Sequence, residues 1–142
     1  MASVFEAILA RAAAVLLSTT AAGTRVYRAR DDAFGAEELP ALNVRRISTG
    51  GDVMGNSGER HTLSFSVAIH AAGAAWETAA DAVHMQAHTV LLADSTLGRL
   101  GRGLRCTGTD TQDDSADQPM GRLTATYQMQ IFTRPGDLAV AI

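Results

Sequence analysis

Two histidines have the spacing of a metal-binding pair. His84 and His88 lie four residues apart in a segment whose apolar pattern predicts a helix, so they share a helix face. Asp81, three residues before His84, could add a carboxylate. The segment lacks the glutamate of a His-Glu-x-x-His motif, which supplies the base in zinc proteases. We therefore expect histidines at the flank of a helix and no bound metal. A small metal-dependent enzyme that uses His84 and His88 stays open as the alternative.

Other chemical motifs are equally weak. The aspartates between residues 110 and 121 lack the alternating ligands and central glycine of a calcium loop, so this segment is expected to be a polar loop. Gly98-x-x-Gly101-x-Gly103 leads into a predicted strand and does not match the glycine motif that binds a dinucleotide. Cys106 is the sole cysteine, and its strand-like surroundings favour a small buried side chain over a nucleophile. We expect no catalytic residue, no cofactor and no metal.

Composition limits the class of protein. The chain has 142 residues, of which 46% are hydrophobic and 19% charged, as in an ordinary globular domain. This length predicts a single domain over residues 1–142. The net charge is −3, and neither half of the chain is basic, which disfavours a dedicated nucleic-acid binder. The longest apolar run, 12–17, is too short to span a membrane, and no signal-peptide pattern is present. We expect a protein that is cytoplasmic when made.

Two segments have helical periodicity. Apolar residues recur at helical spacing over 3–18, where Ser3 can cap the helix and Glu6 can complete a capping box. A second apolar stripe predicts a helix over 74–93. The glycines and polar residues that follow each stripe predict its end.

Five segments have strand character. The alternation of apolar and polar residues is clearest over 61–70 and 122–133, and weaker over 24–30, 41–48 and 104–109. Arg45 and Arg46 cannot share a face of one strand, so one of them must point towards the core side or an edge.

The order of elements predicts an α+β fold. One mostly antiparallel sheet of about five strands should pack both helices on the same face. Residues 31–40 and 49–60 are expected to be loops, the second flexible, and residues 135–142 a loose tail. The expected core lies on the apolar sides of these segments and comprises Phe5, Ile8, Phe65, Val67, Trp76, Val83, Tyr127 and Met129.

Several stretches together resemble one known family. They are Arg30 to Val44 with its acidic residues before Leu39-Pro40, the strand at 61–70 followed by Trp76 and Ala80-Asp81, the helix end Leu92 to Gly98, and the ending Tyr127 to Leu138. In order and spacing they are similar to the tail terminator proteins of long-tailed bacteriophages (minor tail protein U). The resemblance covers about residues 4–138.

The resemblance implies a structural protein of the virion tail. Its members close into a homo-oligomeric ring, expected to be a hexamer, on the finished tail tube and present a surface to the head connector. DNA would be passing cargo, which an acidic balance suits. Assembly would take place in the host cytoplasm. A head–tail joining (neck) protein or a tail tube protein has the same size and composition and stays open as the alternative.

The glycine-rich segment 49–60 is the predicted assembly element. Its four glycines leave the backbone little restrained, and Val53 and Met54 offer its apolar surface. A long loop with so few packing residues is usually functional or disordered. We expect Val53 and Met54 to contact a neighbouring subunit or the tail tube in the assembled ring.

Overall fold

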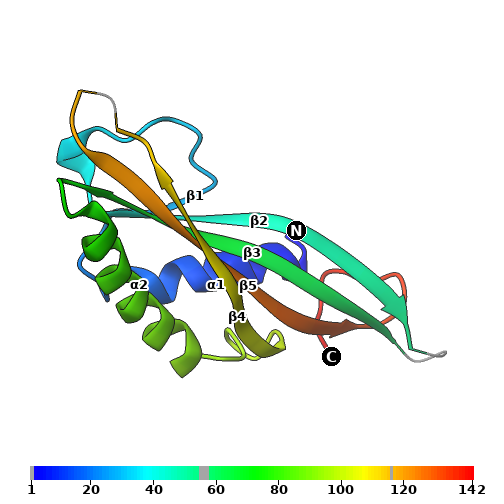
Figure 1. Ribbon diagram of the computed structural model, residues 1–142. Coiled ribbons are helices and arrows are strands. Elements are labelled where there is room, and N and C mark those ends of the chain that lie inside the picture. The colour runs from blue at the N-terminus through cyan, green and yellow to red at the C-terminus, as the bar shows by residue number, and fades with distance from the viewer. Residues whose placement is uncertain (1, 55–57, 116) are drawn as a thin grey trace.

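The computed structural model describes residues 2–54, 58–115 and 117–142, with the side chain of Val53 also left out. These described residues form two α-helices, one short 3-10 helix and five strands (Figure 1). Their order is α1 (Val4–Leu16), β1 (Val26–Arg28), η1 (Ala36–Glu38), β2 (Ala41–Val53), β3 (Glu59–Ala72), α2 (Trp76–Ala93), β4 (Arg102–Asp113) and β5 (Met120–Thr133).

The five strands form one sheet in the order β1-β2-β3-β5-β4. The three pairs β2–β3, β3–β5 and β5–β4 are antiparallel, and β1 alone pairs in parallel, with residues 42–44 of β2. The predicted α+β class with a mostly antiparallel sheet is therefore confirmed.

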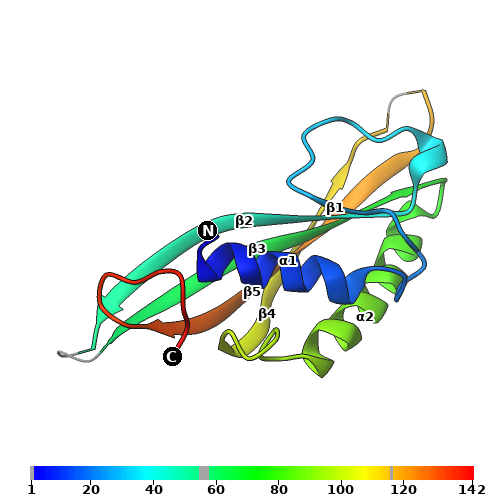
Figure 2. The same cartoon turned by 180° about the vertical axis from the view of Figure 1, so that it is seen from behind.

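Both helices pack on the same face of this sheet, as predicted (Figure 2). The inward side chains of β3 and β5 meet the apolar faces of α1 and α2 in one continuous core. Among the predicted core residues, all but Trp76 are at most 4% exposed. Trp76 is half-buried at the start of α2, because it packs over the edge of the core, beside Gly121.

The structure confirms one of the two capping contacts predicted for the start of α1. The Ser3 hydroxyl accepts a hydrogen bond from the Glu6 backbone N–H at 3.2 Å, so it caps the helix as predicted. The Glu6 carboxylate does not turn back to complete a capping box. It pairs instead with Arg28 at 3.1 Å and Arg46 at 3.4 Å, and so ties α1 to β1 and β2.

The opposite face of the sheet is polar. The alternate residues of β3, Thr62 to His70, lie on it together with Arg45 of β2 and Arg122 of β5. Arg45 and Arg46 pair with the consecutive residues Ser66 and Phe65 of β3, so they point to opposite faces, and a bulge follows them between Arg46 and Ser48. Arg45 lies on the polar face, whereas Arg46 reaches the ring of Phe5 on the helix side, at 5.5 Å. The expectation that these arginines point to different faces is met.

Three segments differ from their predicted conformation. Most of the expected loop 49–60 is strand, because β2 extends to Val53 and β3 begins at Glu59. The expected loop 110–121 is shorter, because β4 extends to Asp113 and β5 begins at Met120. In each case the partner strand supplies backbone hydrogen bonds that a polar or glycine-rich sequence does not reveal. The tail is also tied down, since the Ile142 N–H donates to the Phe132 carbonyl at 2.8 Å.

The longest strands extend beyond the helices. The distal parts of β2 and β3 run past the N-terminus of α1 and form an arm, flanked by the end of β5 and the C-terminal tail (Figures 1 and 2). We call residues 49–54 and 58–63 the β2–β3 arm. Among the described residues, no helix is long and apolar enough to cross a membrane.

Candidate functional site

The two histidines of α2 converge on one buried phenol. Helical spacing places the rings of His84 and His88 side by side, with centroids 5.8 Å apart. His88 Nδ1 lies 2.9 Å and His84 Nε2 lies 3.4 Å from the hydroxyl of Tyr127, whose side chain is fully buried on β5. The two histidines therefore provide hydrogen-bond partners for the buried hydroxyl of Tyr127.

This environment changes the ionisation of the groups involved. Burial, with a smaller contribution from the nearby His88, lowers the pKa of His84. Burial also raises the pKa of the Tyr127 hydroxyl well above its usual range. Both groups are thus held in their neutral forms. Sequence spacing found the two histidines, but Tyr127 lies 39 residues beyond His88 and could be recognised only as core.

A third metal ligand does not join the pair. Within the described parts of the chain, no three histidine, cysteine or acidic side chains are close enough to hold a metal ion. Asp81 is exposed on α2. The contacts of both rings with the Tyr127 hydroxyl give the histidine spacing a structural explanation.

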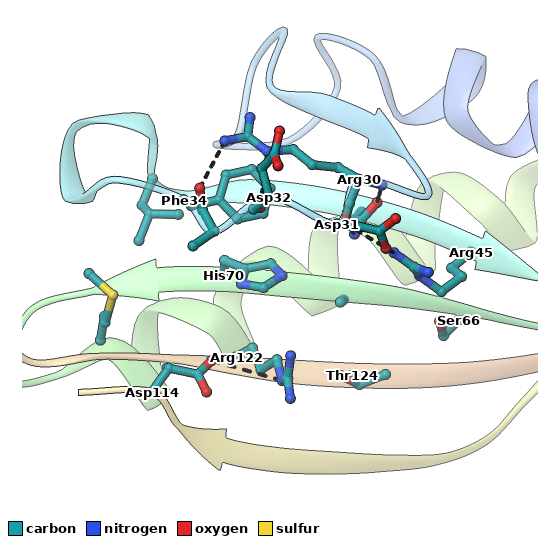
Figure 3. A pocket seen from close by; sticks show the side chains of 16 residues that line it. Arg30, Asp31, Asp32, Phe34, Arg45, Ser66, His70, Asp114, Arg122 and Thr124 are labelled. Carbon is teal, nitrogen blue, oxygen red and sulfur yellow. Dashed lines mark hydrogen bonds and ion pairs between the residues drawn. The ribbon is translucent and has the colours of Figure 1, made fainter. Parts of the chain in front are cut away.

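The polar face of the sheet carries a groove of about 630 Å³ (Figure 3). Strands β2, β3 and β5 form its floor, and the segment between β1 and η1 forms one wall. Its ionisable side chains are those of Arg30, Asp31, Asp32, Arg45, His70, Asp114 and Arg122.

The arginines of this groove are already paired. Arg30 lies 2.9 Å from Glu38 and Arg45 lies 2.8 Å from Asp31. Arg122 lies 3.8 Å from Asp114 (Figure 3). Hydrogen bonds with Arg30 and with the Gly35 backbone hold the pKa of Glu38 below its ordinary value. With these charges balanced by acids, the groove is a concave polar surface and lacks the unpaired cations of an anion site.

An aromatic stack anchors the wall of the groove. The Phe34 ring lies 4.6 Å from the ring of His70 on the sheet and 5.4 Å from that of Tyr27. The guanidinium of Arg30 covers the Phe34 ring at 4.1 Å. Burial, and then the positive charge of Arg122, lowers the pKa of His70. The segment predicted as a loop is therefore fixed on the sheet, which its polar sequence did not indicate.

The predicted assembly contacts lie at the end of the β2–β3 arm. Val53 is the last residue of β2, and its side chain is outside the described residues, as are residues 55–57. Met54 is 47% exposed, and its N–H donates to the Gly58 carbonyl at 2.9 Å. The C-terminal tail adds exposed apolar side chains at Leu138, Val140 and Ile142. The sequence alone did not single out these three exposed residues as candidate contacts.

The remaining candidates have structural roles. Cys106 is half-buried on β4 and packs against the core, as expected of a small apolar side chain. Gly101 lies so close to β5 that a Cβ there would come within 2.8 Å of the Gln130 carbonyl. Gly101 therefore permits a close backbone contact with β5 that a larger residue would block.

Comparison with known proteins shows a likeness in fold. No family model matches the chain, and no curated protein matches it either. Among solved structures, the chain is similar to a chain of the "Virion of native gene transfer agent (GTA) particle", with a TM-score of 0.58 and 20% sequence identity. The match covers 92% of this chain and 92% of that chain. At this identity the likeness establishes the shared fold.

Proposed function

We propose that this chain is a structural subunit of a phage-like virion, and that it is the tail terminator, which closes as a ring on the finished tail tube. The observation that carries the proposal is the fold shared with a virion chain over 92% of both chains. Near-complete coverage of both chains means that the likeness extends over nearly the whole fold and is not confined to one motif.

The order of sequence motifs supports the finer assignment. The segment Arg30 to Val44, which resembles the terminator proteins, forms the anchored wall of the groove and enters β2. The similar ending, Tyr127 to Leu138, forms the second half of β5 and the turn beside the arm. The resemblance covers about residues 4–138, so it includes buried core strands as well as these two segments, which lie at opposite ends of the sheet.

The architecture suits a ring subunit. Both helices cover one face of the sheet, and the other face is polar and hollowed by the groove. A ring with the helices outside would line its channel with the polar face, which carries acids beside its arginines. Balanced charge in a channel disfavours tight binding of DNA that passes through it. The arm and its exposed Met54 would then extend towards an adjoining ring.

The proposed activity is mechanical and needs no catalytic group. A subunit that binds the end of a tube and offers no further tube-binding surface stops polymerisation by occupying the growing end. Self-association must be heterologous and closed, because an open heterologous contact would give a filament. The partners would be other copies of this chain, the tail tube protein and the head connector.

Tube length tests the proposal. Cells that produce the particle without this chain should accumulate tubes of abnormal and variable length, and the chain supplied separately should restore one length and a ring at the tube end. Electron microscopy of purified tails measures both. Tubes of normal length that lack attached heads would instead identify a neck protein. Absence of any tubes would identify a tube subunit.

The enzyme alternative has its own test. A His84→Gln/His88→Gln variant removes both imidazoles and introduces amide groups that can still form hydrogen bonds with Tyr127. If the chain is a structural subunit, the double variant should complement tail assembly fully. The purified wild-type chain should then carry no stoichiometric zinc or manganese. A stoichiometric metal that the variant loses would favour the enzyme.

A further inference from the structure

The sheet has two edges that the described chain leaves uncovered. β4 forms one edge, and within the described residues no strand pairs with its outer side. β2 forms the other edge from Arg45 onward, because β1 pairs only with residues 42–44. An edge strand presents a row of unpaired backbone N–H and C=O groups, which is a template for pairing with another chain.

We propose that the β4 edge of one copy pairs in antiparallel orientation with the β2 edge, residues 45–53, of the next copy. The sheet would then continue from subunit to subunit around the ring. This inference rests on the proposed ring and names the surface through which it closes.

Strand direction within one subunit requires the antiparallel orientation. β2, β3, β5 and β4 follow one another across the sheet, and each step is antiparallel, so β4 runs opposite to β2. A ring is built by rotation, and rotation about an axis roughly parallel to the strands leaves their directions unchanged. β4 of one copy therefore meets β2 of the next in antiparallel orientation. The two edges differ, so the contact is heterologous and can close.

Charge along the two edges favours the same orientation. Along β2 the charge changes from basic at Arg45 and Arg46 to acidic at Asp52. Along β4 it changes from basic at Arg105 to acidic at Asp110. Antiparallel pairing brings opposite charges together at both ends, whereas parallel pairing would place like charges side by side.

The register between β4 of one copy and β2 of the next follows from which residues lie on the polar face and from the position of β1. Arg45 and Asp52 pair with Ser66 and Arg60, six positions apart on β3, and both lie on the polar face. Arg105 and Gln112 pair with Gln128 and Arg122, also six positions apart on β5 and on the same face. Since β1 occupies the β2 edge up to Val44, the end of β4 should reach Arg45.

This register places Asp52 opposite Arg105 and Arg45 opposite Gln112. Asp110 is then the diagonal neighbour of Arg45, within reach of its long side chain. Because β4 has a bulge between Cys106 and Gly108, Gly50 then faces Gly108. A Cβ at either glycine would meet nothing within 4 Å in the isolated subunit.

The charged side chains are free to exchange partners. Asp52 and Arg45 have side-chain exposures of 71% and 43%, and their present ion pairs with Arg60 and Asp31 are on the surface. Surface pairs of this kind contribute little and are readily replaced. Ile47, at the bulge of the same edge, is 53% exposed, so a neighbouring strand would also cover apolar surface.

Disulfide trapping tests the register directly. The full chain carrying Cys106→Ser, Asp52→Cys and Arg105→Cys is concentrated until negative-stain images show rings, and is then oxidised. Residues directly opposite in an antiparallel pair have Cα atoms about 4.5–5.5 Å apart, which suits a disulfide. A non-reducing gel should show a ladder of covalent oligomers up to the ring size. The matched control replaces Arg105→Cys by Glu77→Cys, an exposed position on α2, and should stay at background.

A charge exchange provides a second measurement that does not depend on oxidation. Asp52→Arg should weaken self-association about two- to fivefold per interface, and Asp52→Arg/Arg105→Asp should restore it, as measured by sedimentation. Asp81→Arg on α2 should change nothing. Rings without a ladder above the control, or a double variant that fails to recover, would overturn the edge pairing and leave the proposed function standing. Absence of rings both in solution and on tail tubes would overturn the edge pairing and the proposed function together.

Discussion

Phe65 lies where the core has the least freedom to adjust. It is fully buried in the central strand β3, and its ring stacks on that of Tyr127 at a centroid distance of 5.6 Å. Strands on both sides hold its backbone, since Phe65 pairs with Arg46 on β2 and with Tyr127 on β5. The cavity left by Phe65→Ala should therefore collapse only slightly.

The expected cost follows from these contacts. Burial of a phenylalanine at about 25 cal/mol per Å² and loss of a stacked pair place the cost of Phe65→Ala at about 4 kcal/mol, within the usual 3–5 kcal/mol. With a urea m-value of about 2 kcal/mol/M, the midpoint of unfolding should fall by roughly 2 M. Equilibrium unfolding followed by circular dichroism measures the shift.

Phe132→Ala is the matched control. Phe132 is a half-buried phenylalanine on the adjacent strand β5, and its ring is covered by Arg102 at 4.5 Å, towards the polar face. Its removal should cost only about 1 kcal/mol, because much of its surface is already in water. Equal losses for the two variants would refute the assignment of Phe65 to the centre of the core.

Three further perturbations test separate parts of the structure. A Cβ at Gly121 would come within 2.5 Å of the Trp76 indole, so Gly121→Ala should cost about 1–3 kcal/mol of unfolding free energy, and a Trp76→Leu background should reduce that loss. Ser3→Ala removes the cap of α1 and should cost about 1 kcal/mol in a urea titration; a neutral result would show that the cap is dispensable. Burial lowers the folded-state pKa of His70 and His84, so the unfolded chain takes up protons first. Stability should be fullest above about pH 6.5 and fall as the pH drops from there through the folded-state pKa values, and urea midpoints at pH 7.5 and 5.5 that agree would contradict this.

The periodicity of the sequence was sufficient to locate the helices and strands that bury one face against the core. The apolar stripe of α1 and the alternation in β3 and β5 reflect packing against the core, so these segments and seven of the eight expected core residues could be read without the structure. Ser3 was equally readable, because a cap depends on residues three positions apart. The pair His84 and His88 was found for the same local reason.

Only the tertiary structure decided the features that depend on contacts between residues distant in the sequence. Glycine-rich residues 49–53 are strand because β3 pairs with them, and Glu59 begins β3 because Thr133 lies opposite it on β5. Tyr127 gives the two histidines their role across the boundary between helix and sheet. Strand order, and with it the two open edges, depends on which strands meet in space. Those pairings gain their free energy from backbone hydrogen bonds, which every residue except proline can make, so the side-chain sequence leaves little record of them.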